Sequence, residues 1–333
     1  MFSKRALKLN SELNIQNGKF INLTAGYSDT ETSLPIMLVF HGLSSDSNLT
    51  AWWDKFDWLE ISKNFRVICI NSLGSAFGST GPNNFTFINN INIESKSFPE
   101  ITISDSVNFT LLALKELGIN SVDTVFGCSL GGMQTLDLYL RYPDFAKTFI
   151  STCASELPPI VKLYNLAQIN SLQESIDSQD NLRIKYSYKY ARYFFRLSCT
   201  TNKAIISFEK KLLLENNIEK NTSVAACHKY YLNDGTKYTT EFPVLSYVSI
   251  MNMITNFSLS VLKNKATIIK SKIHLIGISG DLFTPSENVK SLYQSLLDYG
   301  HNAEYHQFET IYGHESWIID GKNFYEFYKK YIT

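Results

Sequence analysis

The sequence predicts an α/β fold with a mostly parallel sheet, and three observations support this. Short runs of β-branched or aromatic residues alternate with helical patterns in the first half of the chain, the same alternation returns after residue 270, and residues 36–40 form a run that is apolar throughout. Strands that alternate with helices are typical of parallel sheets. A continuously apolar strand fits a sheet that helices cover on both faces.

The individual elements follow from local patterns along the chain. Strands are indicated by β-branched and aromatic residues between turn signals, and helices by apolar residues three or four positions apart. In one expected helix, for example, Val107, Leu111 and Leu114 share a face. We predict strands at residues 19–23, 36–40, 65–70, 124–126, 149–150, 273–278 and 303–308, and helices of the core at 103–117, 132–142, 286–297 and 324–331.

The strand pattern stops in the middle of the chain. Between residues 155 and 270 the sequence favours long helices, such as 185–197 and 202–215. A chain of 333 residues is long enough for one large domain with an insertion. We therefore expect an α/β core in two blocks, residues 1–154 and 271–333, and a helical lid over 155–270.

Composition restricts the partners. Lys and Arg total 31 and Asp and Glu total 31, so the formal net charge is zero and no basic surface attracts nucleic acid or anionic lipid. The sequence has no uncharged apolar run of about 18 residues and no apolar leader after Met1. We expect small-molecule substrates, no nucleic acid, no membrane and a cytoplasmic location.

The cysteines predict neither disulfides nor a structural metal. The five cysteines are far apart in sequence, with no C-x-x-C pair and no Cys/His cluster at zinc spacing. We expect no metal in the site.

A nucleophile is predicted at Ser129. The sequence around it, Gly127-Cys128-Ser129-Leu130-Gly131, matches G-x-S-x-G and lies between an expected strand and an expected helix. Glycines at this turn leave room for a strained backbone that exposes the serine hydroxyl at the helix N-terminus. The backbone N–H of Leu130 is then a candidate oxyanion donor.

A serine needs a base and an orienting carboxylate, and His314 and Asp281 are the candidates. Asp281 follows the expected strand 273–278, and His314 follows the last expected strand. The order Ser, Asp, His is that of the α/β-hydrolase fold, and both partners fall at carboxyl ends of strands, where open α/β sheets place their sites. His41-Gly42-Leu43 follows the strand 36–40, which makes the N–H of Leu43 the second expected oxyanion donor and His41 a structural residue.

The chain resembles the homoserine O-acyltransferase family of α/β-hydrolase enzymes. The resemblance covers nearly the whole length and is most specific in the Leu-Gly…Gly-Ser-Thr-Gly-Pro element and the Trp-Trp-Asp before it. The segments that carry it are 41–43, 51–54, 71–74, 78–82, 98–105, 129–134, 141–143, 235–238, 246–247 and 312–314.

The resemblance implies an acyl transfer in two steps. Ser129 takes an acetyl or succinyl group from acyl-CoA, a co-substrate rather than a bound cofactor, and passes it to the hydroxyl of L-homoserine in methionine biosynthesis. The family relationship also implies a homodimer formed through the lid helices.

The resemblance further implies roles for Arg192, which would bind the carboxylate of the acceptor, and Glu315, which would bind its ammonium group.

Three positions depart from the family pattern. Cys199 replaces a tyrosine, Glu315 an aspartate, and Leu130 a methionine. The loss of the hydroxyl at Cys199 and the extra methylene at Glu315 leave two alternatives open. These are a serine O-acyltransferase of cysteine biosynthesis, and a carboxylesterase or thioesterase that uses the same triad with water. A non-catalytic binding protein is a third interpretation, which the presence of Ser129, Asp281 and His314 disfavours.

Overall fold

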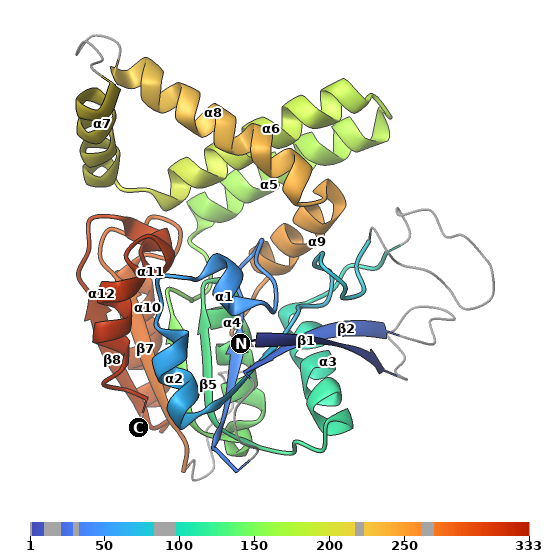
Figure 1. Cartoon of the computed structure of the whole chain (residues 1–333), viewed down its shortest axis with the longest axis vertical. Coiled ribbons are helices and arrows are strands. Elements are labelled where there is room, and N and C mark those ends of the chain that lie inside the picture. Colours follow the sequence, from blue (N-terminus) through green and yellow to red (C-terminus); the bar gives the residue numbers. More distant parts are fainter. Residues whose placement is uncertain are drawn as a thin grey trace, which may run out of the picture.

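The protein is built on one mixed sheet whose central part is parallel (Figure 1). The computed structural model describes residues 2–9, 21–28, 33–82, 98–216, 223–260 and 270–332. In this part of the chain the strand order is β1-β2-β4-β3-β5-β6-β7-β8; β1 and β2 are antiparallel and the other six strands run parallel. The strands are β1 Phe2–Leu9, β2 Ile21–Ser28, β3 Ile36–Phe40, β4 Arg66–Ile70, β5 Val122–Cys128, β6 Ala146–Thr152, β7 Lys272–Ile278 and β8 Ala303–Phe308.

The strand register brings the ends of the central strands together. Phe40 of β3 pairs with Gly127 of β5, while Thr152 of β6 pairs with Cys128 of β5 and with Ile276 of β7. The carboxyl ends of β3, β5, β6 and β7 therefore lie side by side along one end of the sheet, which we call its carboxyl edge. The loops that follow these strands lie close together there.

Helices cover both faces of the sheet. One apolar cluster joins the sheet to α3, α4 and α10, and a second joins it to the segment containing α1 and α2 and to the C-terminal helices. This explains why residues 37–40 are almost fully buried. The core helices are α1 Leu49–Trp52, α2 Trp58–Asn64, α3 Ile103–Glu116, α4 Leu130–Arg141, α10 Ser286–Asp298, α11 Ser316–Ile319 and α12 Gly321–Tyr328, with short 3-10 helices at Pro143–Phe145 and Gly313–Glu315.

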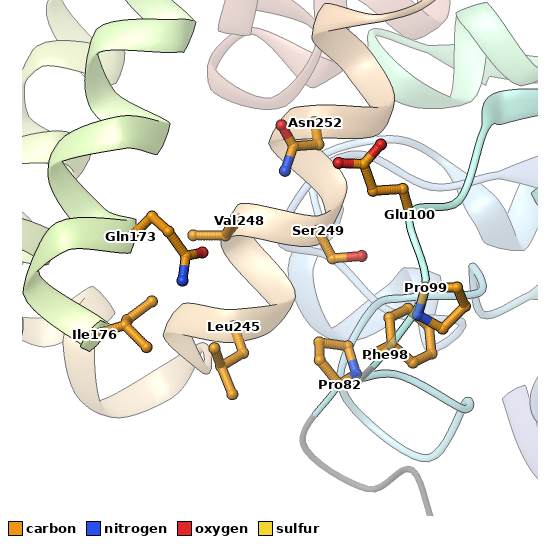
Figure 2. Close-up of a pocket in the computed structure, with 10 residues that line it drawn as sticks. All are labelled: Pro82, Phe98, Pro99, Glu100, Gln173, Ile176, Leu245, Val248, Ser249 and Asn252. Atoms are coloured by element: carbon orange, nitrogen blue, oxygen red, sulfur yellow. The ribbon is translucent and has the colours of Figure 1, made fainter. Parts of the chain in front are cut away.

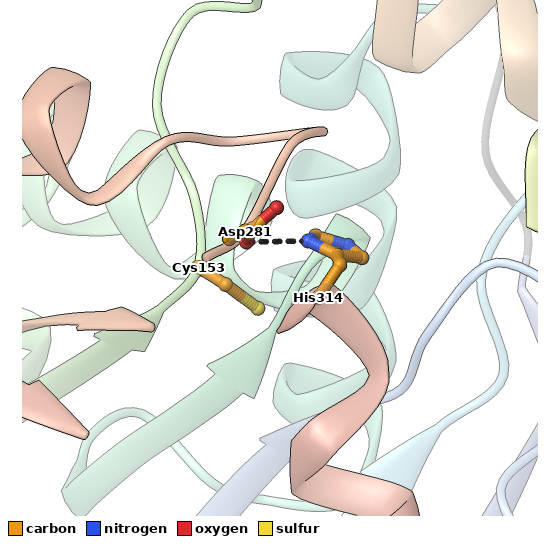
Figure 3. A group of neighbouring side chains, drawn as sticks. All are labelled: Cys153, Asp281 and His314. Carbon is orange, nitrogen blue, oxygen red and sulfur yellow. Dashed lines mark hydrogen bonds and ion pairs between the residues drawn. The ribbon is translucent and has the colours of Figure 1, made fainter. Parts of the chain in front are cut away.

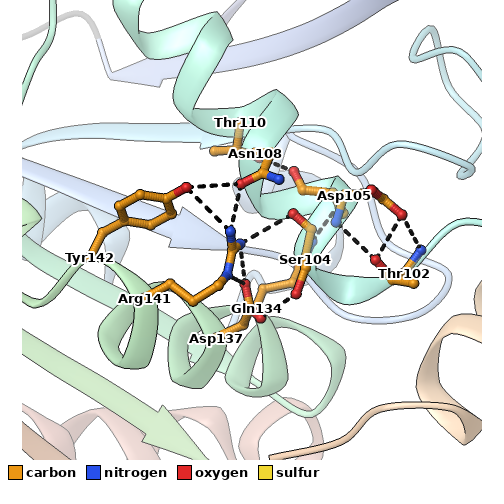
Figure 4. Close-up of polar contacts among 10 residues, drawn as sticks. Thr102, Ser104, Asp105, Asn108, Thr110, Gln134, Asp137, Arg141 and Tyr142 are labelled. Carbon is orange, nitrogen blue, oxygen red and sulfur yellow. Dashed lines mark hydrogen bonds and ion pairs between the residues drawn. The ribbon is translucent and has the colours of Figure 1, made fainter. Parts of the chain in front are cut away.

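A polar network fixes α4 against α3 (Figure 4). The α3 helix begins with a capping box, in which Thr102 Oγ1 accepts from Asp105 N at 3.1 Å and Asp105 Oδ2 accepts from Thr102 N at 2.8 Å. At the end of α4, Arg141 Nε donates to Asp137 Oδ2 at 2.8 Å and its Nη1 donates across to Asn108 Oδ1 at 2.7 Å. These bonds hold the helix whose N-terminus carries Ser129.

Five helices between β6 and β7 form a layer beyond the carboxyl edge of the sheet (Figure 1). The α6 and α8 helices pack closely because Gly235 has no side chain: a Cβ there would lie 2.5 Å from Lys189 O. None of the helices in the described ranges is both long and apolar enough to cross a membrane. The helices of the layer are α5 Pro159–Asp177, α6 Asn181–Cys199, α7 Asn202–Asn216, α8 Ser223–Glu241 and α9 Val244–Thr255.

The observed elements agree with the α/β architecture that the sequence predicts. The expected strands between residues 36 and 308 and the four expected core helices are present, with ends that differ by a few residues. Residues 19 and 20 of the first expected strand lie outside the described residues, and β2 begins at Ile21. The edge strand β1 was not predicted; it pairs only with β2, so it lacks the continuous apolar run that marks a central strand.

Candidate active site

Ser129 stands on a strained turn between β5 and α4. Its φ of 57° and ψ of −121° are unfavourable for a residue with a side chain, and its N–H donates to Thr152 O at 3.0 Å. The adjacent glycines are required sterically: a Cβ on Gly127 would lie 2.1 Å from Gly131 O, and one on Gly131 would lie 2.2 Å from Phe40 O. The glycines of the sequence motif thus let three backbone segments meet below the serine.

Ser129, His314 and Asp281 form one hydrogen-bonded chain. His314 Nε2 lies 2.7 Å from Ser129 Oγ, and His314 Nδ1 lies 2.7 Å from Asp281 Oδ2 (Figure 3). All three side chains are buried. The three predicted residues, which are up to 185 positions apart in sequence, therefore meet at the carboxyl edge of the sheet.

The surroundings of Asp281 fix the tautomer of His314. Asp281 Oδ1 accepts from the backbone N–H groups of Phe283 and Thr284 at 2.8 and 2.9 Å, and these bonds orient the carboxylate so that Oδ2 faces the imidazole. His314 therefore donates from Nδ1 to Asp281, which leaves Nε2 free to accept the hydroxyl proton of Ser129. The Phe283 ring packs 5.0 Å from the imidazole and shields it from water.

The two expected oxyanion donors lie on backbone segments that touch. Leu130 is the first residue of α4, where backbone N–H groups lack partners within the helix. The next residue, Gly131, packs against Phe40 O and His41 O, so the start of α4 adjoins the loop that contains Leu43. The roles of Leu43 and Leu130 stay predictions.

His41 has the structural environment expected from the sequence. Its Nε2 accepts from Ser72 N at 2.9 Å, so its Nδ1 carries the proton and donates to Gly42 O at 2.7 Å. Burial lowers the pKa of His41 and outweighs the opposing effect of the hydrogen bond to Gly42. The neutral imidazole holds this loop to the end of β4.

Four charged residues gather above the triad, and we call Arg192, Arg196, Asp234 and Glu315 the charge cluster. Arg192 and Arg196 are four positions apart on α6 and share a face, Asp234 comes from α8, and Glu315 follows His314 directly. Arg196 Nη1 donates to Glu315 Oε2, while the Nε atoms of Arg192 and Arg196 lie 3.4 and 3.8 Å from Asp234 Oδ2. The cluster has a formal charge of zero.

The charge cluster keeps Glu315 ionised. Burial raises the pKa of its carboxyl, but the nearby Arg196 and Arg192 outweigh burial and hold the pKa below its ordinary value. Arg196 donates a hydrogen bond to Glu315, whereas Arg192 forms an ion pair with Asp234. The Nε atoms of both arginines lack a hydrogen-bond partner among the described residues. The Arg192 guanidinium is buried and lies 4.3 Å from the ring centre of Tyr238, which holds it in place.

Two cavities border the lid. One of about 500 Å³ is lined by Arg192 and Asp234 together with Ser44, the neighbour of Leu43, so it connects the charge cluster to solvent. The other, of about 290 Å³, lies between α5, α9 and the segment 98–100 (Figure 2). None of the triad residues lines this second cavity.

The donor set at Asp281 and His314 suits proton transfer better than metal binding. Cys153 lies beside them (Figure 3). Burial raises the pKa of the Cys153 thiol well above its ordinary value, so the thiol keeps its proton and is a poor ligand.

Sequence reasoning found Arg192 and Glu315 but missed Arg196 and Asp234. Arg196 is one helical turn from Arg192, and this i, i+4 spacing could have revealed it. Asp234 precedes Gly235, yet nothing in the local pattern shows which helix α8 packs against. Cys199, which we noted as a departure, is buried at the end of α6.

A family model described as the alpha/beta hydrolase fold matches residues 35–297. The chain belongs to the α/β-hydrolase fold family. The match covers Ser129 and Asp281 of the triad, residues 155–270 and five of the eight described strands, β3 to β7. It does not by itself define the reaction, because this fold carries many reactions.

Curated relatives of the chain include several homoserine O-acetyltransferases. The chain is 26% identical to a homoserine O-acetyltransferase of Methanobrevibacter ruminantium over 94% of its own length and 69% of that protein. The resemblance that the sequence motifs indicate is confirmed by this match.

Solved structures agree on the fold. A homoserine O-acetyltransferase from Bacillus anthracis superposes with a TM-score of 0.82 at 19% identity, covering 100% of this chain and 98% of that one. Esterase E22 superposes with the same TM-score at 16% identity, covering all of both chains. At these identities the structures establish the α/β-hydrolase fold and leave the reaction to be argued from the site.

Proposed function

We propose that the protein is an O-acyltransferase that moves an acetyl or succinyl group from acyl-CoA to the hydroxyl of L-homoserine, in methionine biosynthesis. The observation that carries the proposal is the Ser129–His314–Asp281 chain together with the charge cluster, whose Glu315 directly follows His314. The similarity to homoserine O-acetyltransferases supports the same reaction.

In the first step Ser129 becomes acylated. His314 Nε2 takes the hydroxyl proton, Ser129 Oγ bonds to the thioester carbon, and the oxyanion rests on the N–H groups of Leu43 and Leu130. The carbon–sulfur bond then breaks, and His314 returns the proton to the leaving thiolate. Asp281 stabilises the imidazolium throughout.

In the second step the acceptor hydroxyl gives its proton to His314 and attacks the acyl carbon. The bond to Ser129 Oγ breaks, and the serine recovers its proton from His314. A zwitterionic amino acid carries one carboxylate and one ammonium group, and the charge cluster offers groups of both signs. Arg192 binds the acceptor carboxylate, in competition with Asp234, and Glu315 binds the ammonium group.

The test measures release of coenzyme A from acetyl-CoA and succinyl-CoA, with product mass as the second readout. We expect release to continue beyond a single turnover only when homoserine is present, and no covalent acylation in Ser129→Ala. Release that is equally fast without an acceptor contradicts transfer, and acylation of Ser129→Ala contradicts the proposed nucleophile.

The pairing of Arg196 with Glu315 favours a second candidate. An acceptor ammonium group must compete with Arg196 for this carboxylate, which weakens binding of homoserine and leaves serine or water as alternative acceptors. A serine O-acyltransferase gives O-acylserine in the same mass assay. A carboxylesterase or thioesterase hydrolyses a short p-nitrophenyl ester at a rate that homoserine does not change.

We also propose a homodimer formed through the lid helices. Leu182, Tyr186, Tyr190 and Phe194 are exposed at intervals of four residues along α6, with Leu182 68% and Phe194 56% accessible. Such a stripe favours a protein contact. Light scattering is expected to give a dimer for the native chain and a monomer for Tyr186→Glu/Phe194→Glu; a monomeric native chain contradicts the proposal.

A further inference from the structure

The side chains of two histidines and a glutamate meet on β7 and β8. The β8 strand is the last strand on one side of the sheet (Figure 1). His274 comes from β7, and Glu304 and His306 come from β8. His274 pairs with Glu304 in the register of the two strands, and His306, two residues further along β8, points to the same face as Glu304. The three side chains are therefore neighbours because of strand pairing, although the strands are separated in sequence.

The three ligand atoms form a triangle of the size that zinc requires. His274 Nδ1 lies 3.0 Å from His306 Nε2 and 3.3 Å from Glu304 Oε2, and His306 Nε2 lies 3.5 Å from the same oxygen. Bonds of about 2.0–2.1 Å in a tetrahedral zinc site place neighbouring ligand atoms about 3.3–3.4 Å apart. The observed spacing therefore accepts an ion with shifts of only a few tenths of an ångström.

The chemistry of the group matches this geometry. Imidazole nitrogens and carboxylate oxygens are both zinc ligands. Lys272 Nζ lies 2.7 Å from Glu304 Oε1, and the other oxygen of Glu304, Oε2, lies within 3.5 Å of both histidines. Two imidazoles and one carboxylate favour zinc over calcium or magnesium.

The group is open to solvent and separate from the triad. The Glu304 side chain is 44% accessible and that of His306 21%, so an ion can enter and a water molecule can complete the coordination. The ring of Tyr331 stacks on His306 at 4.1 Å and covers the other side. His274 lies near the start of β7, about 13 Å of strand from its carboxyl end, which precedes Asp281.

We propose that His274, Glu304 and His306 form a binding site for a divalent transition-metal ion, with Zn²⁺ the best fit and water as the fourth ligand. The ion would fasten the edge strand β8 to β7. Neither the family resemblance nor the cysteine and histidine spacing predicts this site, because its ligands come from two strands that only the tertiary structure places side by side.

The experiment titrates Zn²⁺ into the full-length, tag-free chain after treatment with EDTA and removal of the chelator. Calorimetry is expected to show one ion per chain with micromolar affinity, and Co²⁺ is expected to give the intense visible absorption of a tetrahedral complex. His306→Ala and Glu304→Gln are each expected to weaken binding at least tenfold. His228→Ala, at an exposed histidine of the lid, is the matched control and is expected to keep the native affinity.

Further measurements separate this site from other causes. The melting temperatures of the variants in EDTA test whether they fold. The native chain and His228→Ala are expected to gain thermal stability from Zn²⁺, and His306→Ala and Glu304→Gln are not. Lys272→Met is expected to tighten binding, because it removes a cation that competes for Glu304. The proposal is overturned if the native chain binds no Zn²⁺ at a concentration of about 100 μM, which is about 100 times the expected dissociation constant. It is also overturned if His306→Ala and Glu304→Gln bind Zn²⁺ as tightly as the native chain does.

Discussion

Replacing Arg196 with methionine tests the charge cluster. The native cluster is neutral, and Arg196→Met leaves two carboxylates facing Arg192 alone. The side chains of Arg196 and Glu315 are 17% and 12% accessible, so solvent cannot compensate fully for the lost partner. Removing one member of a buried ion pair costs about 3–5 kcal/mol. The unfolding entropy of a chain of this length is about 0.7 kcal/mol/K, so we expect Tm to fall by about 4–7 °C.

The assay is a double-mutant cycle with Glu315→Gln, measured by urea unfolding and by thermal melting. The double variant restores neutrality, so it is expected to lose about 2–3 kcal/mol less than the sum of the two single variants. Arg183→Met is the matched control, because Arg183 lies on the same helix but is exposed, and is expected to change stability by less than about 0.5 kcal/mol. A Tm loss below 1 °C in Arg196→Met, or additive losses in the double variant, refutes the reasoning.

Three further predictions concern the site and the backbone around it. Asp281→Asn is expected to lower kcat by about 10³–10⁴-fold with little change in KM, because the imidazole loses the acceptor that fixes its tautomer; kinetics within tenfold of the native values contradict this. Gly132→Ala places a Cβ 2.6 Å from Thr152 O and is expected to cost more stability than Gly118→Ala, whose Cβ meets nothing within 4 Å and whose cost comes only from its φ of 76°. Urea unfolding compares the two, and equal losses contradict the steric argument. The pKa of His41 in the folded state lies below its unfolded value of about 6.5 because the residue is buried. Its contribution to stability is therefore complete above about pH 6.5 and is lost as the pH falls through the folded pKa. His41→Gln is expected to flatten the pH dependence of the free energy of unfolding, and an unchanged slope contradicts this role of His41.

Much of the core was predictable because its signals are local. The apolar run at residues 36–40 reflects a strand buried on both faces, and the motif at Ser129 reflects a turn that only glycines on either side permit. The strand β1 gave no such signal, since an edge strand paired on one side is free to carry polar residues.

The sequence by itself indicated the strands from residue 36 onward, four helices of the core, a helix-rich middle segment, and which serine, histidine and aspartate are candidates for the triad. These depend on hydrophobic periodicity and on turn chemistry, which act over a few residues. Only the tertiary structure decided that Arg196 pairs with Glu315, that Asp234 joins them from α8, and that His274 meets His306 across two strands. Such contacts depend on how helices and strands pack, and distances of a few ångströms between residues far apart in the chain are fixed by that packing alone.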